Sequence, residues 1–212
     1  MTPPVASPRL RRLAHPAAVP APSPGGAAEE RCDLCNESIG AQHRHLLDLD
    51  DRRLLCVCQA CRILFEQRAA GGGHLRLVPE RRLRLGGFEL DDASWASLRI
   101  PVDMAFFFHA TPVGRVVAFY PGPMGATESA LELEAWAQLV AANPVLEALE
   151  PDVEALLVNR ARGAREHFVV PVDDCYRLAG LIRMHWKGLS GGQEVWERIA
   201  SFFDELRREA RT

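Results

Sequence analysis

The stretches CDLC at residues 32–35 and CQAC at residues 58–61 decide how this chain is built. Each Cys-x-x-Cys pair places two sulfur atoms on one tight turn, so both can reach a single ion. Two such turns complete the tetrahedral, four-sulfur shell that zinc takes in structural sites. The sequence therefore predicts a zinc-ribbon-like module whose metal ligands are Cys32, Cys35, Cys58 and Cys61.

A fifth cysteine, Cys56, lies two residues before Cys58. Residues two apart in a strand share a face, so Cys56 is either a buried spare or a replacement for Cys58 as ligand. We favour Cys58, because its Cys-x-x-Cys pair mirrors the first one. His43 and His45 lie between the two pairs. We interpret them as a histidine pair on a hairpin, or one of them as a hydrogen-bond partner of a thiolate.

Iron is the alternative to zinc in the same four sulfurs. Four thiolates also hold the single iron of a rubredoxin, which would make the module a one-electron carrier. The second turn of a rubredoxin reads Cys-Pro-x-Cys-Gly, whereas residues 58–62 read CQACR. We therefore expect zinc as the cofactor, with iron as the alternative.

The composition is that of an ordinary globular protein, with 212 residues, 48% of them hydrophobic and 25% charged. A formal net charge of -3 argues against a nucleic-acid partner. No apolar run is long enough for a transmembrane helix, and prolines break the start where a secretory signal would need an apolar core. We therefore expect a cytoplasmic protein without membrane insertion, in which reduced cysteines serve as metal ligands rather than disulfides.

Changes in composition divide the chain into four parts. Residues 1–29 are rich in proline and alanine, so we expect a disordered tail. Residues 30–68 form the zinc-ribbon-like module, residues 69–73 a glycine linker, and residues 74–212 one mixed α+β domain. The predicted fold class is therefore α+β, with a small module followed by a larger domain.

Hydrophobic periodicity and turn residues predict the elements of both parts. In the module we expect two strands, 45–49 and 53–57, joined by a turn at Asp50-Asp51. In the larger domain, Asp91 and Asp173 are predicted to cap the helices that follow them. The expected strands of that domain are residues 74–79, 82–85, 102–110, 115–120, 153–158 and 167–172, and the expected helices are residues 92–98, 127–142, 145–149, 174–186 and 193–209.

A second alternative is an enzyme whose site lies in the α+β domain. Cys175 stands at a predicted helix N-terminus, where the helix dipole lowers the pKa of a thiol, and His185 lies on the same helix. His109 and His167 can contribute only if the fold brings them close. The two aspartates before Cys175 oppose a thiolate. We therefore expect no catalytic residue and favour a non-enzymatic protein.

Six segments of the chain resemble an uncharacterised bacterial family, a domain of unknown function. They read ERCDLC, HRHLLDLD, LLCVCQAC, LVNRARGAREH, DDCYRLAGLIRMHWKGLSGG and EVWERIASFFDEL, and the resemblance runs from about Glu30 to the C-terminus. Genes of this family often lie beside genes for nickel–iron hydrogenase subunits and maturation factors. The resemblance implies an accessory role in hydrogenase assembly or electron supply, and it implies no catalytic residues. Because rubredoxin-like proteins accompany some hydrogenases, the resemblance is also compatible with iron in the four-cysteine site.

These observations together predict a non-enzymatic, metal-binding accessory protein with a protein partner. From the resemblance, that partner is a hydrogenase subunit or a maturation factor. We expect the contact to be made by the exposed face of the module, or by two arginine-rich loops at residues 76–84 and 160–165 that can bind phosphate or an acidic protein face.

Overall fold

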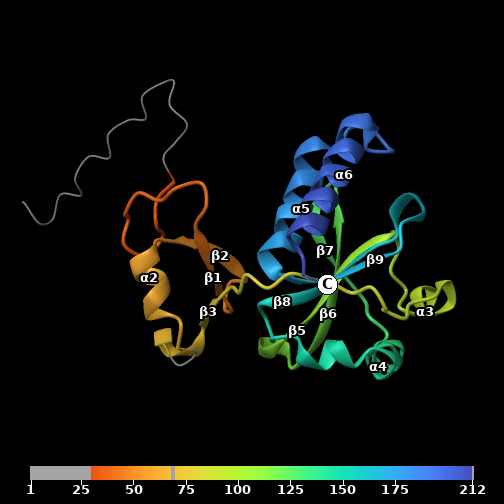
Figure 1. The fold of residues 1–212 in the computed structure, drawn as a ribbon, viewed down its shortest axis with the longest axis horizontal. Helices are drawn as coiled ribbons and strands as arrows, with labels where there is room; N and C mark the ends of the chain where they lie inside the picture. The colour runs from red at the N-terminus through yellow and green to blue at the C-terminus, as the bar shows by residue number, and fades with distance from the viewer. Residues whose placement is uncertain (1–29, 68–69, 212) are drawn as a thin grey trace, which may run out of the picture.

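Two antiparallel sheets organise the chain (Figure 1). The computed structural model describes residues 30–67 and 70–211, so the disordered tail predicted at residues 1–29 lies outside the described residues. A three-stranded sheet belongs to the N-terminal module, and a six-stranded sheet forms the larger part of the molecule. The fold class is α+β, as predicted.

The small sheet has the strand order β2-β1-β3. Strands β1 (Arg44–Asp48) and β2 (Arg53–Val57) form the predicted hairpin, and helix α2 (Gln59–Leu64) follows closely. Strand β3 (Leu75–Leu77) comes after the 3-10 helix η1 (Ala70–Gly73) and pairs with β1. The glycine-rich segment therefore lies between two strands of one sheet, and the domain boundary placed there stays a prediction.

The large sheet has the strand order β4-β9-β8-β5-β6-β7, with every neighbouring pair antiparallel. Its central strands β5 and β8 are almost entirely buried, because helices cover both faces of the sheet. The six strands are β4 (Leu83–Arg84), β5 (Met104–Ala110), β6 (Arg115–Gly122), β7 (Gly125–Ser129), β8 (Glu154–Asn159) and β9 (Glu166–Pro171). Short 3-10 helices, η2 (Thr111–Val113) and η4 (Ala161–Gly163), join β5 to β6 and β8 to β9.

The helices form one layer on each face of this sheet (Figure 1). Helices α5 (Val172–His185) and α6 (Gly192–Glu209) cover one face. Helices α3 (Asp92–Ser97) and α4 (Leu133–Ala142), with the 3-10 helix η3 (Pro144–Ala148), cover the other. None of the helices in the described ranges combines the length and the apolar character needed to cross a membrane.

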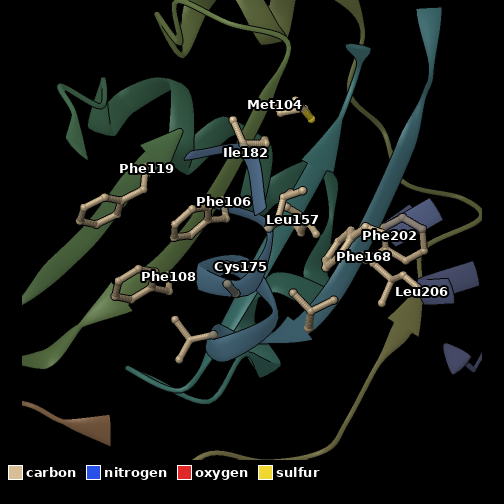
Figure 2. Packing of buried hydrophobic residues seen from close by; sticks show 14 of the residues in the cluster. Met104, Phe106, Phe108, Phe119, Leu157, Phe168, Cys175, Ile182, Phe202 and Leu206 are labelled. Carbon is tan, nitrogen blue, oxygen red and sulfur yellow. The ribbon is translucent and has the colours of Figure 1, made fainter. Parts of the chain in front are cut away.

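Alternate residues of β5 supply two separate cores, as strand geometry requires. Phe106 and Phe108 belong to the core under α5 and α6, which also holds Leu157 and Cys175 (Figure 2). Phe107 points to the other face and stacks on Trp136 of α4, with ring centroids 5.3 Å apart. The larger part is therefore held together by burial on both sides of one sheet.

Three details of the predicted elements were wrong, and the cap at Asp91 was confirmed. The strand predicted at residues 74–79 was grouped with those of the large sheet, but β3 pairs with β1 in the small sheet. The helix predicted from Thr127 begins at Leu133, because the chain turns back after β6 and residues 125–129 form the ladder of β7 along it. Asp173 does not cap α5; β9 runs directly into the helix, so Pro171 is the cap residue. Asp91 does cap α3, since its side chain accepts a hydrogen bond of 2.7 Å from the backbone N–H of Ser94.

The two faces of the small sheet have different roles. One face contributes Leu47 to the core under α5 and α6, with Leu49 and Leu54 packed against that core. The opposite face forms a small core of its own, made of Leu46, Leu55 and Val57 together with two of the cysteines, Cys32 and Cys61. The hairpin therefore separates the cysteine pairs from the large domain.

Candidate metal centre

Four cysteine sulfurs meet beside the end of β2. Cys32 and Cys35 belong to the first Cys-x-x-Cys turn, Cys58 is the N-cap residue of α2, and Cys61 lies inside that helix. All four sulfur atoms lie within 4.8 Å of one another, and those of Cys35 and Cys58 are 3.6 Å apart. In a tetrahedral zinc site with Zn–S bonds of about 2.3 Å, the sulfurs are about 3.8 Å apart. This group, called the four-cysteine cluster below, can therefore hold one metal ion.

Hydrogen bonds dock the first cysteine turn onto β2. The backbone N–H of Asp33 donates to the carbonyl oxygen of Cys56 (2.8 Å), and a carboxylate oxygen of Asp33 accepts from the backbone N–H of Cys56 (2.7 Å). Asn36 closes the turn with a φ of 64°, a left-handed conformation that asparagine tolerates. Its N–H donates to the carbonyl oxygen of Cys32. The strand that leads into the second turn thus also positions the first.

The environment favours a thiolate at Cys32. Burial by itself opposes ionisation, but backbone N–H groups of Cys58, Cys35 and Leu34 hydrogen-bond to its sulfur and lower the pKa of Cys32 to about 6. Burial, reinforced by the neighbouring thiols, raises the pKa of Cys61 to about 12. Of these two thiols, the buried Cys32 therefore loses its proton first. Thiolate is the form that binds a metal ion.

Cys56 lies outside the four-cysteine cluster. Leu55 and Val57 face the small core that contains Cys32, so Cys56, between them in β2, faces the other side of the sheet. There it forms a group with His43 and His45, whose donor atoms lie within 4.8 Å of one another and of its sulfur. The structure thus places Cys58, and not Cys56, beside the other three cysteines.

Sequence reasoning did not find the group of His43, His45 and Cys56, although a signal was present. A hairpin turn centred between Asp50 and Asp51 puts residue 45 opposite residue 56. The structure has this register, with His45 paired to Cys56.

Cys175 is not placed as a nucleophile. Its side chain is completely buried in the core under α5 and α6 (Figure 2). Burial, with the charges of Asp174 and Asp173, raises the pKa of the Cys175 thiol well above its usual value. His185, near the end of the same helix, instead bonds to Glu194 of α6 over 3.0 Å.

The two histidines of the large sheet lie near opposite ends of β8. The carbonyl oxygen of His109 accepts from the backbone N–H of Asp152, just before β8, whereas His167 pairs with Val158 near the end of that strand. The ring of His167 stacks on Phe88 with centroids 4.7 Å apart. Among the described residues, neither histidine joins a group that could hold a metal ion.

The arginine-rich loops bind the chain's own carboxylates. Arg81 and Arg82 form ion pairs with the buried Glu154 and Asp174. Arg160 is itself buried and pairs with Asp92. The guanidinium groups of these three arginines are therefore occupied inside the fold.

A search of curated proteins and a search of solved structures each gave no match to the chain. One family model, described as a family of unknown function (DUF5947), matches residues 31–210. The matched range includes the four-cysteine cluster and both sheets. The chain therefore belongs to this family of unknown function.

Proposed function

We propose that the chain is a non-enzymatic, metal-binding interaction protein whose four-cysteine cluster holds one structural zinc ion. The observation that carries this proposal is the convergence of four cysteine sulfurs from two short turns. All six cysteines lie in the described part of the chain and are free thiols. Four thiolates are the closed donor set that zinc takes in structural sites.

The small size of the module supports a structural role for the ion. Its own core contains five buried residues, and two of them, Cys32 and Cys61, are proposed ligands. So little apolar burial supplies little folding free energy, whereas a structural zinc site supplies a large share in small domains. Zinc would therefore hold the first cysteine turn and α2 against the hairpin.

The proposed partner is a nickel–iron hydrogenase subunit or a maturation factor, met in the cytoplasm, where cysteine ligands stay reduced. The resemblance to a family encoded beside hydrogenase genes supports this partner. Large apolar side chains are exposed around the cysteine turns, with Leu34 41%, Ile63 53% and Leu64 66% exposed. Exposed apolar side chains of this kind suit docking on another protein.

A rubredoxin-like electron carrier is the second candidate, and one observation favours it. Cys35 is exposed, so one edge of the four-cysteine cluster lies at the protein surface. Electron transfer through a four-thiolate iron site needs such an edge. Elemental analysis and a visible spectrum of protein purified without added metal separate the two candidates. Zinc gives no visible band, whereas iron gives thiolate charge-transfer bands that bleach reversibly on reduction.

The interaction role has its own test. Hydrogenase subunits and maturation factors should co-purify with the tagged full-length chain, and the double variant Ile63→Asp, Leu64→Asp should abolish this while keeping its zinc. Met124, 87% exposed on the turn between β6 and β7, offers a matched control, and Met124→Asp should bind as the wild type does. If both variants lost binding to the same extent, the assignment of the docking surface to the module would be contradicted.

A further inference from the structure

A second group of potential metal ligands lies on the face of the β1–β2 hairpin opposite the four-cysteine cluster. His45 and Cys56 are direct cross-strand partners. His43, two residues before His45, faces the same side. One donor atom from each of the three side chains lies within 4.8 Å of the other two, and all three residues are partly buried.

Hydrogen bonds hold both imidazoles in the form that a metal ion needs. His43 Nδ1 lies 2.9 Å from the carbonyl oxygen of Gly40, and His45 Nδ1 lies 2.8 Å from a carboxylate oxygen of Asp173. Both oxygens accept hydrogen bonds, so each Nδ1 carries a proton, and in the neutral imidazole each Nε2 has a free lone pair. A carboxylate or carbonyl bound to the far nitrogen is the usual support of a metal-binding histidine.

The Nε2 atom of His43 has no other role in the described structure. It is buried and has no hydrogen-bond partner, and the His43 side chain is only 9% exposed. His109 Nδ1 and His167 Nε2 are also buried and unpaired in the described structure, but neither belongs to a group of potential metal ligands. A buried nitrogen lone pair without a partner is costly. A metal ion between the three side chains would satisfy it.

We propose that His43, His45 and Cys56 bind a second metal ion, a divalent cation of the zinc type, through two imidazole nitrogens and one thiolate. Two nitrogens and one sulfur suit a borderline ion such as Zn²⁺ better than the oxygen-seeking Mg²⁺ or Ca²⁺. Unlike the four-cysteine cluster, this site has three protein ligands, which leaves one position of a tetrahedron for water or an exogenous ligand.

The surroundings favour such a cation. A cavity of about 700 Å³ between the module and α5 is lined by both histidines but not by Cys56. Five carboxylates line it with three arginines, so acidic groups outnumber basic ones: Glu80, Asp173, Asp174, Glu205 and Glu209 against Arg44, Arg82 and Arg177. Four thiolates around one zinc ion in the four-cysteine cluster would leave a net negative charge there, so a second cation nearby is attracted rather than repelled. Asp173 adds a negative charge directly behind His45.

Zinc stoichiometry of the full chain tests the proposal. After equilibration with buffered Zn²⁺, the wild type should hold two zinc ions. His43→Gln, His45→Gln and Cys56→Ser should each lose the ion of the proposed second site and keep the ion of the four-cysteine cluster. Cys32→Ser should lose the ion of the four-cysteine cluster instead, which separates the two sites. His109, a partly buried histidine outside both groups, provides the control, and His109→Gln should keep both ions.

Cobalt identifies the ligands. With zinc in the four-cysteine cluster, added Co²⁺ should give the absorption of a single thiolate–cobalt bond in the wild type, and this absorption should vanish in Cys56→Ser. One zinc ion in the wild type, unchanged in Cys56→Ser, would overturn the proposal. Loss of the same ion from Cys56→Ser and Cys32→Ser would also overturn it, by assigning Cys56 to the four-cysteine cluster. If circular dichroism shows Cys56→Ser unfolded, His43→Gln decides, because it leaves every cysteine in place.

Discussion

His45 and Asp173 are 128 residues apart in the sequence, yet His45 Nδ1 lies 2.8 Å from a carboxylate oxygen of Asp173. His45 belongs to β1 of the module, and Asp173 lies in the first turn of α5. Leu47, two residues further along β1, enters the core under that helix. The hydrogen bond therefore joins the module to the α+β part, and it also orients an imidazole of the proposed second metal site.

Asp173→Asn should weaken zinc binding at the second site about 10- to 100-fold, because a neutral amide supports the His45 imidazole less well than a carboxylate does. Competition titration with a zinc chelator measures the change, and the ion in the four-cysteine cluster should be unaffected. Glu205→Gln is the control, since this exposed carboxylate lies in the same region and pairs with Arg177 rather than with a histidine. Equal affinities in wild type and Asp173→Asn would show that the contact does not support a metal ligand.

Local sequence patterns predicted much of this fold correctly. The β1–β2 hairpin, the strands of the large sheet other than β7 and the cap at Asp91 all follow from alternation, turn residues and capping, which act over a few positions. Strand β7 was missed because Thr127 and Glu128 also fit the start of an amphipathic helix. The open edge of β6, which provides the ladder for these residues, cannot be recognised from the segment itself.

The site was predictable to a similar degree. The spacing of the cysteines is enough to suggest the four-cysteine cluster, since each pair lies on one turn. The pairing of Cys56 with His45 was missed, although a turn centred between Asp50 and Asp51 predicts it. The contact with Asp173 was not predictable, because it depends on how α5 packs against the small sheet. Asp173 itself was misread as a helix cap because β9 runs directly into α5, so the helix begins at Val172 and Pro171 is the cap residue.

Cys32→Ser should remove the ion of the four-cysteine cluster and loosen residues 30–66, while the α+β domain stays folded. Serine is a poor zinc ligand, and the module has little core to hold it without the ion. Zinc analysis with amide hydrogen exchange measures both effects. Cys175→Ala, at the buried sixth cysteine, should keep its zinc. Full zinc in Cys32→Ser would refute the ligand assignment, and unfolding of the whole chain would refute the domain boundary.

Arg82→Met should lower the free energy of unfolding by about 3 kcal/mol. Arg82 donates two hydrogen bonds to Asp174, of 2.6 and 3.1 Å, and the Asp174 side chain is buried. Burial raises the pKa of Asp174 despite this pairing. Without Arg82 the buried carboxylate keeps only the longer ion pair with Arg177, of 3.4 Å, which compensates its burial less well. Urea denaturation measures the loss.

The exposed pair of Arg115 and Glu128 is the control for this prediction. Arg115→Met should change the free energy of unfolding by less than about 1 kcal/mol. The double variant Arg82→Met, Asp174→Leu should recover most of the stability lost in Arg82→Met, because it leaves no buried charge unpaired. A double variant as unstable as the single one would contradict this explanation.

His167 should make stability depend on pH. Burial and the charges of Arg160 and Arg165 lower the pKa of His167 to about 4, against the opposing charge of Glu166. In the unfolded chain its pKa is about 6.5. The unfolded state therefore takes up the proton first, and the free energy of unfolding falls as the pH drops from 6.5 to 4. This contribution is at most about 3 kcal/mol.

His167→Gln isolates the effect, because it removes the titrating group and leaves the cysteines unchanged. Urea denaturation of both proteins at several pH values gives the difference in free energy of unfolding, wild type minus variant. This difference should become smaller as the pH is lowered from 6.5 to 4. The effect of pH on the metal site is the same in both proteins, so it cancels in the difference. A difference that stays constant across this window would show that the native state does not hold His167 neutral.

The most direct test of the four-cysteine cluster is X-ray absorption at the zinc and iron edges, on the Cys56→Ser variant purified without added metal. This variant lacks the thiolate of the proposed second site, so the signal reports on the four clustered cysteines. We expect zinc with four sulfur ligands at about 2.3 Å. Iron with four sulfurs would instead make the module a redox centre, and nitrogen or oxygen ligands on zinc would contradict the assignment of Cys32, Cys35, Cys58 and Cys61.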